Sequence, residues 1–561
     1  MTKSRLPVDP NDDSLYFLPL GGSDEIGMNL NLYGYAGRWL IVDLGITFGD
    51  DTTPGVDIIL PDVRLLEQHR GDLAGLFLTH GHEDHIGAVP YLWSKLRCPI
   101  WCTPFTASLV RRKLDDVGLL NQVEINEVPL GEEFVIGPFE LELVSMTHSI
   151  PESNLVVIRC GAGNVVHTGD WKFDPTPYIG EEPDYDALKR IGDEGVTALV
   201  GDSTNVFEPG STGSEETVRK ELTRVIGEQT GKVVVTCFAS NVARLESIAV
   251  AAAACERQTA LVGRSLWRMH DAAKANGYLE HAPTFISDKE AEMFPEDKVV
   301  LICTGSQGES RAALARIADN SHPGVSLGEG DVCIFSSRQI PGNELAISRI
   351  QNKLVSRGVK VITAEDEPGV HVSGHPARDD LTRMYQLLRP ELLVPVHGDA
   401  RHLREHAALG KACQISETIV PGNGSMIRIV GGETGIVDWY PTSSLAFDGG
   451  RLIPLQSDAL QDRRRMLHNG MASVTLVADD AGSLQAEPVV TFTGLAEDEE
   501  AYDLEDEAIE LIETSISGLS RKDRRNDDLL REAARRAVRR VAKMALGKRP
   551  VTEVHLVRLP D

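Results

Sequence analysis

The segment LAGLFLTHGHEDHIGAVPYL restricts the possible folds of this chain more than any other segment does. Its apolar run LAGLFL predicts a strand, which leads directly into four potential metal ligands: His80, His82, Asp84 and His85. A turn after a strand can aim the first two side chains to one side and the last two to the other. Imidazole and carboxylate groups in this mixture suit Zn²⁺ or a similar first-row metal. The sequence therefore predicts a site for two cations a few Å apart.

One turn cannot fill two coordination spheres, so further ligands must come from elsewhere in the chain. Polar side chains end three later strand-like runs: His148 after FELELVSMT, Asp170 after NVVHTG and His397 after LLVPV. The prediction is two ligand sets bridged by Asp170, one of His80, His82 and His148 and the other of Asp84, His85 and His397. Asp43, at the end of the run LIVD, is expected to orient a ligand histidine.

Strand and helix signals divide the chain into domains. Short β-rich runs fill residues 15–202, and strands alternate with helices over residues 213–365. Strand-like segments ending in histidine return near residues 371–399, as though the first domain resumes after an insertion. The predicted boundaries are 1–212 and 366–456 for the first domain, 213–365 for the insertion, 457–470 for a polar linker and 471–561 for a small α+β domain.

Composition restricts the partners and the compartment. The chain has 56 Lys and Arg against 84 Asp and Glu, a net charge of −28, so its average surface repels polyanions. A nucleic acid would have to be held by a local basic groove or by bound metal. The N-terminal segment MTKSRLPVDPNDD has no apolar signal core, and no apolar run reaches the roughly 18 residues that a membrane span needs. We expect a cytoplasmic protein with no membrane partner.

The histidine turn and the two ligand sets resemble the metallo-β-lactamase superfamily, whose HxHxDH signature falls on residues 80–85. The insertion before the returning histidines resembles that of the β-CASP nucleases, which places acidic motif A on Asp202, the motif B histidine on His375 and the motif C histidine on His397. The segments FASN, GSQGE and SSRQIPGNE are similar to those of bacterial ribonuclease J. The resemblance implies an αββα sandwich with an inserted β-CASP α/β domain and a small α+β C-terminal domain.

The resemblance also implies a ribonuclease with two Zn²⁺ per subunit, Mn²⁺ or Mg²⁺ being alternatives. Metal-bound hydroxide would attack the phosphodiester, and the cations would neutralise charge that builds on the phosphate. The implied activity is 5′→3′ exonucleolysis preferring a 5′-monophosphate, plus endonucleolytic cutting of single-stranded RNA, in RNA processing and decay. Catalytic roles fall on His375, which would protonate the departing 3′ oxygen, and on Asp202 and Asp84.

A terminal phosphate needs hydrogen-bond donors, and two short segments offer them. The segment HVSGH contains His371, Val372, Ser373, Gly374 and His375, and the segment FASN contains Ser240 and Asn241. Glycine lets the backbone approach a ligand closely. Arg244, one helical turn beyond Ser240, is expected to add positive charge.

The C-terminal domain separates its charges along the chain. Residues 521–549 contain twelve Lys or Arg and four Asp or Glu. Apolar residues recur there at helical spacing: Leu530, Ala534, Ala537, Val538, Val541 and Ala545. The arginine-bearing face has two interpretations, a solvated helix packed on its own domain or on a subunit, and a face that touches RNA. We expect a homodimer or homotetramer assembled through this domain.

Two other functions fit the same motifs. The chain could be an RNA-binding scaffold of an RNA-decay complex with weak catalysis, acting through its basic C-terminal helix. It could also be a β-CASP nuclease directed at DNA. The complete ligand set disfavours the scaffold, whereas the sequence does not separate DNA from RNA.

Overall fold

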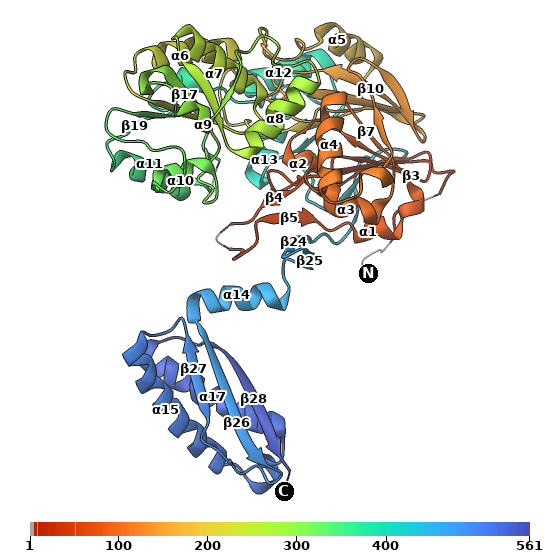
Figure 1. The fold of residues 1–561 in the computed structure, drawn as a ribbon. Coiled ribbons are helices and arrows are strands. Elements are labelled where there is room, and N and C mark those ends of the chain that lie inside the picture. The colour runs from red at the N-terminus through yellow and green to blue at the C-terminus, as the bar shows by residue number, and fades with distance from the viewer. Residues whose placement is uncertain (1–4, 8, 51, 341, 561) are drawn as a thin grey trace. The chain divides into compact units, whose positions relative to one another are not determined.

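The structure, a computed structural model, describes residues 5–7, 9–50, 52–340 and 342–560 (Figure 1). The chain divides into two compact units. The first contains Met1–Thr47 and Leu60–Thr442, and the second contains Phe48–Ile59 and Ser443–Asp561. Segment 48–59 thus belongs to the second unit, although it lies inside the range that the sequence predicted for the first domain.

Two mixed sheets pack face to face in the first unit. The strand orders are β23-β22-β1-β2-β3-β6-β7-β8 and β21-β20-β13-β12-β11-β10-β9. The first sheet contains β1 (Leu15–Gly21), β2 (Leu30–Tyr35), β3 (Arg38–Val42), β6 (Leu73–Leu78), β7 (Ile100–Cys102), β8 (Ile125–Glu127), β22 (Ser425–Val430) and β23 (Gly435–Trp439). The second contains β9 (Glu133–Ile136), β10 (Phe139–Ser145), β11 (Asn154–Cys160), β12 (Gly163–His167), β13 (Ala198–Asp202), β20 (Leu392–Val396) and β21 (Glu417–Thr418). Phe17 and Phe77 of the first sheet share one buried core with Val156 and Val394 of the second.

Helices cover the outer faces of both sheets (Figure 1). Helices α5 (Tyr185–Glu194), α12 (Arg378–Leu388) and α13 (Ala400–Ala412) lie against the seven-stranded sheet. Their leucines pack on apolar side chains of that sheet, such as Val166 and Leu199. Helices α1 (Arg64–Gln68), α3 (Val89–Leu96) and α4 (Pro104–Asp116) flank the eight-stranded sheet. The predicted αββα sandwich is confirmed.

A parallel α/β domain is inserted between β13 and β20. Its sheet has the order β16-β15-β17-β14-β18-β19, with all described pairs parallel. The strands are β14 (Val233–Thr236), β15 (Gln258–Val262), β16 (Ile286–Ser287), β17 (Val299–Cys303), β18 (Val332–Phe335) and β19 (Lys360–Ile362). The helices are α6 (Glu215–Gly227), α7 (Val242–Ala254), α8 (Arg264–Ala275), α9 (Asp288–Ala291), α10 (Ala313–Ala318) and α11 (Glu344–Val355). Runs such as VVLIC are fully buried, as expected for a parallel sheet covered on both faces.

The chain returns to the sandwich after this insertion. Strand β20 pairs in parallel with β13, so residues 392–396 rejoin the sheet that the chain left at Asp202. Strand β22 then pairs with β1. Residues nearly 200 positions apart are thereby brought to one sheet edge, where the candidate ligands lie.

Two small sheets are formed mainly by residues of the second unit. One has the order β25-β24-β5-β4 and consists of β4 (Thr47–Phe48), β5 (Ile58–Pro61), β24 (Ser444–Asp448) and β25 (Arg451–Pro454). The other has the order β27-β26-β28 and consists of β26 (Met471–Asp479), β27 (Val489–Thr493) and β28 (Val551–Leu559). The helices are α14 (Asp458–Asn469), α15 (Asp498–Ser517), α16 (Arg521–Arg524) and α17 (Asp527–Leu546). Residues 457–470, predicted as a polar linker, therefore contain a helix.

Helix α17 carries the predicted basic block. Its buried stripe consists of Leu530, Ala534, Ala537, Val538, Val541 and Ala542, and it packs on α15 and β28. Ala545 is exposed, so the prediction that it belongs to this stripe is wrong. The buried stripe ends at Ala542, three positions before Ala545.

Candidate metal centre

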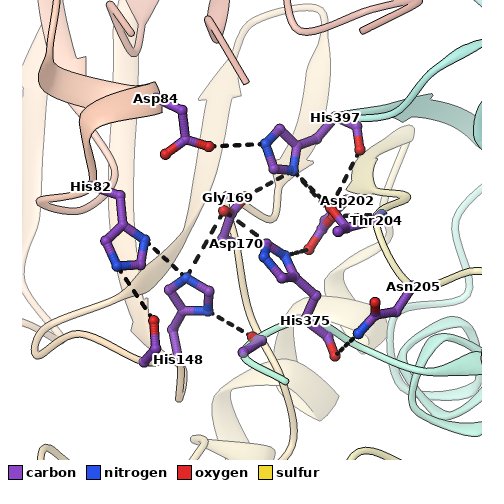
Figure 2. A network of polar contacts seen from close by, with 12 residues as sticks. His82, Asp84, His148, Gly169, Asp170, Asp202, Thr204, Asn205, His375 and His397 are labelled. Atoms are coloured by element: carbon purple, nitrogen blue, oxygen red, sulfur yellow. Dashed lines mark hydrogen bonds and ion pairs between the residues drawn. The ribbon is translucent and has the colours of Figure 1, made fainter. Parts of the chain in front are cut away.

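The histidine turn connects the end of β6 to the short helix α2 (Glu83–Ile86). His80 and His85 are almost completely buried, and His82 and Asp84 are half-buried. The segment after β3 supports this turn, because the amide of Leu44 donates to the carbonyl of His85 at 2.7 Å. The other candidate ligands follow β10, β12 and β20 and meet the turn at the same edge of the sandwich (Figure 2).

Three imidazoles form the first candidate set. His82 Nδ1 lies 3.1 Å from His80 Nε2 and 3.1 Å from His148 Nε2. An oxygen of Asp170 lies 3.9 Å from the facing nitrogens of His80 and His148. A single proton can join only two of these nitrogen atoms, whereas a metal ion can accept all three lone pairs. The geometry therefore fits a cation.

The second candidate set contains more carboxylate. Asp170 Oδ2 lies 3.2 Å from His85 Nε2, and Asp170 Oδ1 lies 3.4 Å from His397 Nδ1. Asp84 Oδ2 lies 3.1 Å from His397 Nε2 and 3.6 Å from His85 Nε2. In each set, the candidate ligand atoms lie within 4.8 Å of one another, and Asp170 belongs to both. The sequence predicted this grouping, including the shared carboxylate.

Burial gives these groups unusual protonation. Burial and the neighbouring imidazoles lower the pKa of His80 and His148, and burial lowers the pKa of His82 to about 4. These imidazoles are neutral at pH 7, which is the form that binds metal. Burial also opposes charge on His85 and His397, but nearby carboxylates, Asp170 first, outweigh it and raise their pKa. Negative charge on the buried carboxylates is unfavourable unless positive charge lies beside it, and either protons on the histidines or divalent cations can supply that charge.

Other side chains fix the ring nitrogens that do not face the cluster. Asp43 Oδ2 lies 2.7 Å from His85 Nδ1, and the same carboxylate accepts from the amide and hydroxyl of Thr79. The carbonyl of Gly374 accepts from His148 Nδ1 at 2.6 Å, so Nε2 of that ring presents a lone pair. Asp43 is therefore placed for the predicted orienting role. Thr79, and Gly374 in this role, were not predicted, because their contacts depend on how loops meet.

His375 and Asp202 form a pair beside the cluster (Figure 2). His375 Nδ1 lies 2.8 Å from Asp202 Oδ2, and Asp202 Oδ1 accepts from the hydroxyl of Thr204. Burial favours the neutral ring, but the carboxylates of Asp202 and Asp170 outweigh it and raise the pKa of His375. The side-chain amide of Asn205 donates to the carbonyl of His375 at 3.0 Å. Thr204 and Asn205 follow Asp202 closely in the chain, but the sequence analysis gave a role to Asp202 alone.

The segments predicted to bind phosphate come together around Arg244. Ser373 Oγ accepts from the side chain of Asn205 and from the amide of His375, which leaves its hydroxyl proton for another acceptor. Asn241 uses its side-chain oxygen to cap α7, accepting from the amide of Arg244. Ser240 lies just before this cap and is half-buried. Arg244 reaches His371 and the carbonyl of Val372, and so connects α7 to the segment HVSGH.

The sequence analysis expected Arg244 to add positive charge at the phosphate site. Its side chain is fully buried and its guanidinium is paired with Glu215. The expectation that Arg244 adds free charge to a ligand is therefore wrong, because every guanidinium nitrogen already donates to a protein acceptor. The partner could not be predicted, since Glu215 lies 29 positions earlier on another helix.

Comparison with known families places the chain. Four family models match it: "Metallo-beta-lactamase superfamily" over residues 29–237, "Ribonuclease J, beta-CASP domain" over 230–354, "Zn-dependent metallo-hydrolase RNA specificity domain" over 364–421 and "Ribonuclease J C-terminal domain" over 458–559. A ribonuclease J of Sinorhizobium meliloti is 41% identical over 98% of both chains. The chain belongs to the ribonuclease J family. It is accordingly a metal-dependent hydrolase with a β-CASP domain, as predicted.

Other ribonuclease J chains are also similar. That of Corynebacterium glutamicum is 38% identical and matches 98% of this chain and 76% of its own length. That of Thermus thermophilus is 35% identical over 83% of each chain. A solved structure titled as a protein of unknown function from Enterococcus faecalis covers 74% of this chain and all of its own, with a TM-score of 0.50 and 16% identity. That likeness concerns the fold alone.

Within the described ranges, no helix is both long enough and apolar enough to cross a bilayer.

Proposed function

We propose that this ribonuclease J hydrolyses RNA phosphodiesters with two divalent cations, Zn²⁺ first and Mn²⁺ or Mg²⁺ as alternatives. It would act as a 5′→3′ exonuclease that prefers 5′-monophosphate ends and as an endonuclease on single-stranded RNA, in RNA processing and decay. One observation carries the proposal: two buried ligand sets share Asp170 beside the Asp202–His375 pair. The ribonuclease J relatives and the RNA-specificity match support RNA as the substrate.

The ligand side chains would hold the cations, with Asp170 between them. Bound there, such ions supply Lewis acidity, which lowers the pKa of water and neutralises phosphate oxygens. The protein contributes by fixing the donors: Asp43 holds the His85 ring and the Gly374 carbonyl holds the His148 ring. Donors held in this way need little rearrangement when the substrate arrives.

His375 would protonate the departing 3′ oxygen. Asp202 binds Nδ1 of its ring, so the proton for transfer is carried on Nε2. Because the carboxylates outweigh burial and raise its pKa, the ring keeps its proton to higher pH than an ordinary histidine, which favours a donor role. Asp202 would therefore act by keeping the general acid charged and oriented, and Asp84 would act as a ligand at the second ion.

The segments HVSGH and FASN would hold the 5′-monophosphate. The Ser373 hydroxyl retains a proton to donate, and Gly374 permits close backbone approach. An Nε2–H on His371 would be a second donor. Small donors of this kind suit a phosphate, whereas they provide no base-specific reading.

We also propose a cytoplasmic homodimer or homotetramer assembled through the C-terminal region. The β27-β26-β28 sheet supports this. Its core-facing side packs on α15 and α17, whereas Val489, Val557 and Leu559 on its strands are 62%, 47% and 43% exposed. Exposed apolar residues on a strand surface favour a protein partner.

The test is release of mononucleotides from 5′-monophosphorylated RNA, with and without chelator, and with DNA of the same sequence. We expect chelator-sensitive release from RNA, restored by added Zn²⁺ or Mn²⁺. His82→Ala should abolish release and reduce bound metal while leaving the circular dichroism spectrum unchanged. Absence of chelator-sensitive hydrolysis would leave the scaffold function, and equal digestion of DNA would favour the DNA-directed one.

A further inference from the structure

The backbone of His397 adopts an unfavourable conformation. Its φ angle is 53°, in the left-handed region that residues other than glycine rarely adopt. Such a conformation persists only where surrounding contacts hold it. His397 lies directly after β20, which ends at Val396, and Nε2 of its ring lies 3.1 Å from Asp84 Oδ2. The direction of this ring therefore depends on the contacts that hold the backbone at residue 397.

The loop that follows β1 holds this part of the backbone. The amide of His397 donates to the carbonyl of Gly22 at 2.6 Å. The next residue, Gly398, forms isolated β-bridges with two residues of the loop, Ser23 and Glu25. Because both residues after β20 are paired with the loop after β1, a shift of that loop would also shift His397.

Two side chains, Glu25 and Asn423, fix the loop after β1, and we call them the clasp. Asn423 comes from the segment between β21 and β22. Its Oδ1 accepts from the amide of Ser23 at 3.1 Å, and its side-chain amide donates to Glu25 Oε1 at 2.6 Å. The same Glu25 oxygen accepts from the amide of Gly22 at 3.3 Å. An asparagine suits this place, because its side chain donates and accepts at once.

We propose that the two clasp side chains are positioning residues for the second candidate ligand set: they hold the loop after β1 so that the Gly22 carbonyl keeps His397 turned toward Asp84. This rests on the proposed function. Neither Glu25 nor Asn423 belongs to a candidate ligand set. The clasp would therefore act on one cation, through His397, and the cation of the first set would keep its three imidazoles.

The test is zinc binding by the full-length protein freed of metal, measured by competition with a chromophoric chelator in the absence of RNA. Asn423→Asp keeps the size of the side chain but turns its donor into a carboxylate oxygen that faces Glu25. We expect one Zn²⁺ to keep its affinity and the other to bind about 10–100-fold more weakly. Adding His82→Ala, which removes a ligand of the first set, should then leave neither ion tightly bound.

Exchanging the two clasp groups tests whether the hydrogen bond between them matters. Glu25→Gln combined with Asn423→Asp moves the amide to position 25 and the carboxylate to position 423, so the bond can form with its donor reversed. We expect this double variant to recover most of the lost affinity. Asn126→Asp is the matched control, because Asn126, on the edge strand β8, also donates its side-chain amide to a carboxylate, that of Glu124 at 3.3 Å. This control should leave both zinc affinities unchanged.

Thermal unfolding of the metal-free variants identifies any variant that is unfolded. Equal weakening of both ions in Asn423→Asp, or unchanged binding of both, would overturn the inference. A double variant that unfolds at the wild-type temperature but recovers no affinity would also overturn it. Zinc binding that responds to the clasp as expected, without any hydrolysis of RNA, would instead count against the proposed function alone.

Discussion

The charge on Asp202 controls the protonation of His375. Burial disfavours the charged ring, but the carboxylate at 2.8 Å outweighs it and raises the pKa of His375. In the proposed mechanism His375 is the general acid, which works only when protonated, so we expect activity to fall as the pH rises through this pKa. Asp202→Asn removes the negative charge and lowers the pKa. We therefore expect the basic limb of the kcat profile to move to lower pH, with kcat reduced about 100-fold above neutral pH.

The measurement is kcat against pH, with metal content determined at each end of the range. Metal content matters because Asp202 also lies 3.4 Å from His397 Nδ1. A basic limb that stays in place while bound metal is unchanged would show that His375 is not the group that titrates.

Asp43 acts on the cluster through His85. It accepts from the Thr79 amide at 2.8 Å and lies 2.7 Å from His85 Nδ1. Asp43→Asn weakens both contacts and is expected to lower metal affinity about 10–100-fold, measured by competition with a chromophoric chelator. Asp331→Asn is the control, because Asp331 is likewise a carboxylate that accepts backbone N–H groups but lies in the inserted domain. Equal effects of the two substitutions would contradict the orienting role.

At the scale of elements, the segment after β3 sets the shape of the histidine turn. A Cβ added at Gly45 would lie 1.6 Å from the backbone oxygen of Asp84, so the backbone would have to move. Gly45→Ala is expected to destabilise the protein by about 1–3 kcal/mol and to weaken metal binding. Thermal unfolding with and without metal measures both. Gly71→Ala, where a Cβ meets nothing within 4 Å, should leave both unchanged.

Strand ends explain what the sequence could predict of this site. Strands β12, β13 and β20 run parallel, so the residues that follow them, including Asp170 and His397, reach one edge of the sheet. Residues that follow parallel strands meet at one edge of a sheet, so the apolar runs and the polar residue after each run are enough to predict this part of the site. The Gly374 carbonyl on His148 joins positions 226 apart through an irregular loop. The spacing of residues in the sequence does not predict such a contact. It also does not predict the ion pair between Glu215 and Arg244.

For the whole molecule, the ligand cluster is contained within the first unit. A truncated variant that ends at residue 470 keeps this unit and the strands β24 and β25, but it lacks the sheet β27-β26-β28. We expect such a chain to keep kcat on short RNA within about twofold, because additive effects are usual for distant sites. Its mass by light scattering should be that of a monomer. A full-length protein that is already monomeric would contradict assembly through this region.

The division into units was predictable only in part. Alternating strands and helices marked the inserted domain, since its parallel sheet needs a helix between successive strands. The grouping of residues 48–59 with the C-terminal unit could not be predicted. It depends on β5 lying next to β24 in one sheet, and β24 comes nearly 400 positions later in the chain. Strands as short as β5 and β24, with four and five residues, carry too little pattern to reveal such a partner.

The segment HVSGH makes three contacts within five consecutive residues: His371 with the buried guanidinium of Arg244, Gly374 with a ring of the candidate ligand cluster, and His375 with Asp202. If the 5′ end of the RNA binds at one end of this segment and the phosphodiester is cleaved at the other, the segment sets the distance between the bound 5′ end and the cleaved bond. The length of each released product would then be set by the geometry of the protein and would not depend on the nucleotide sequence of the RNA.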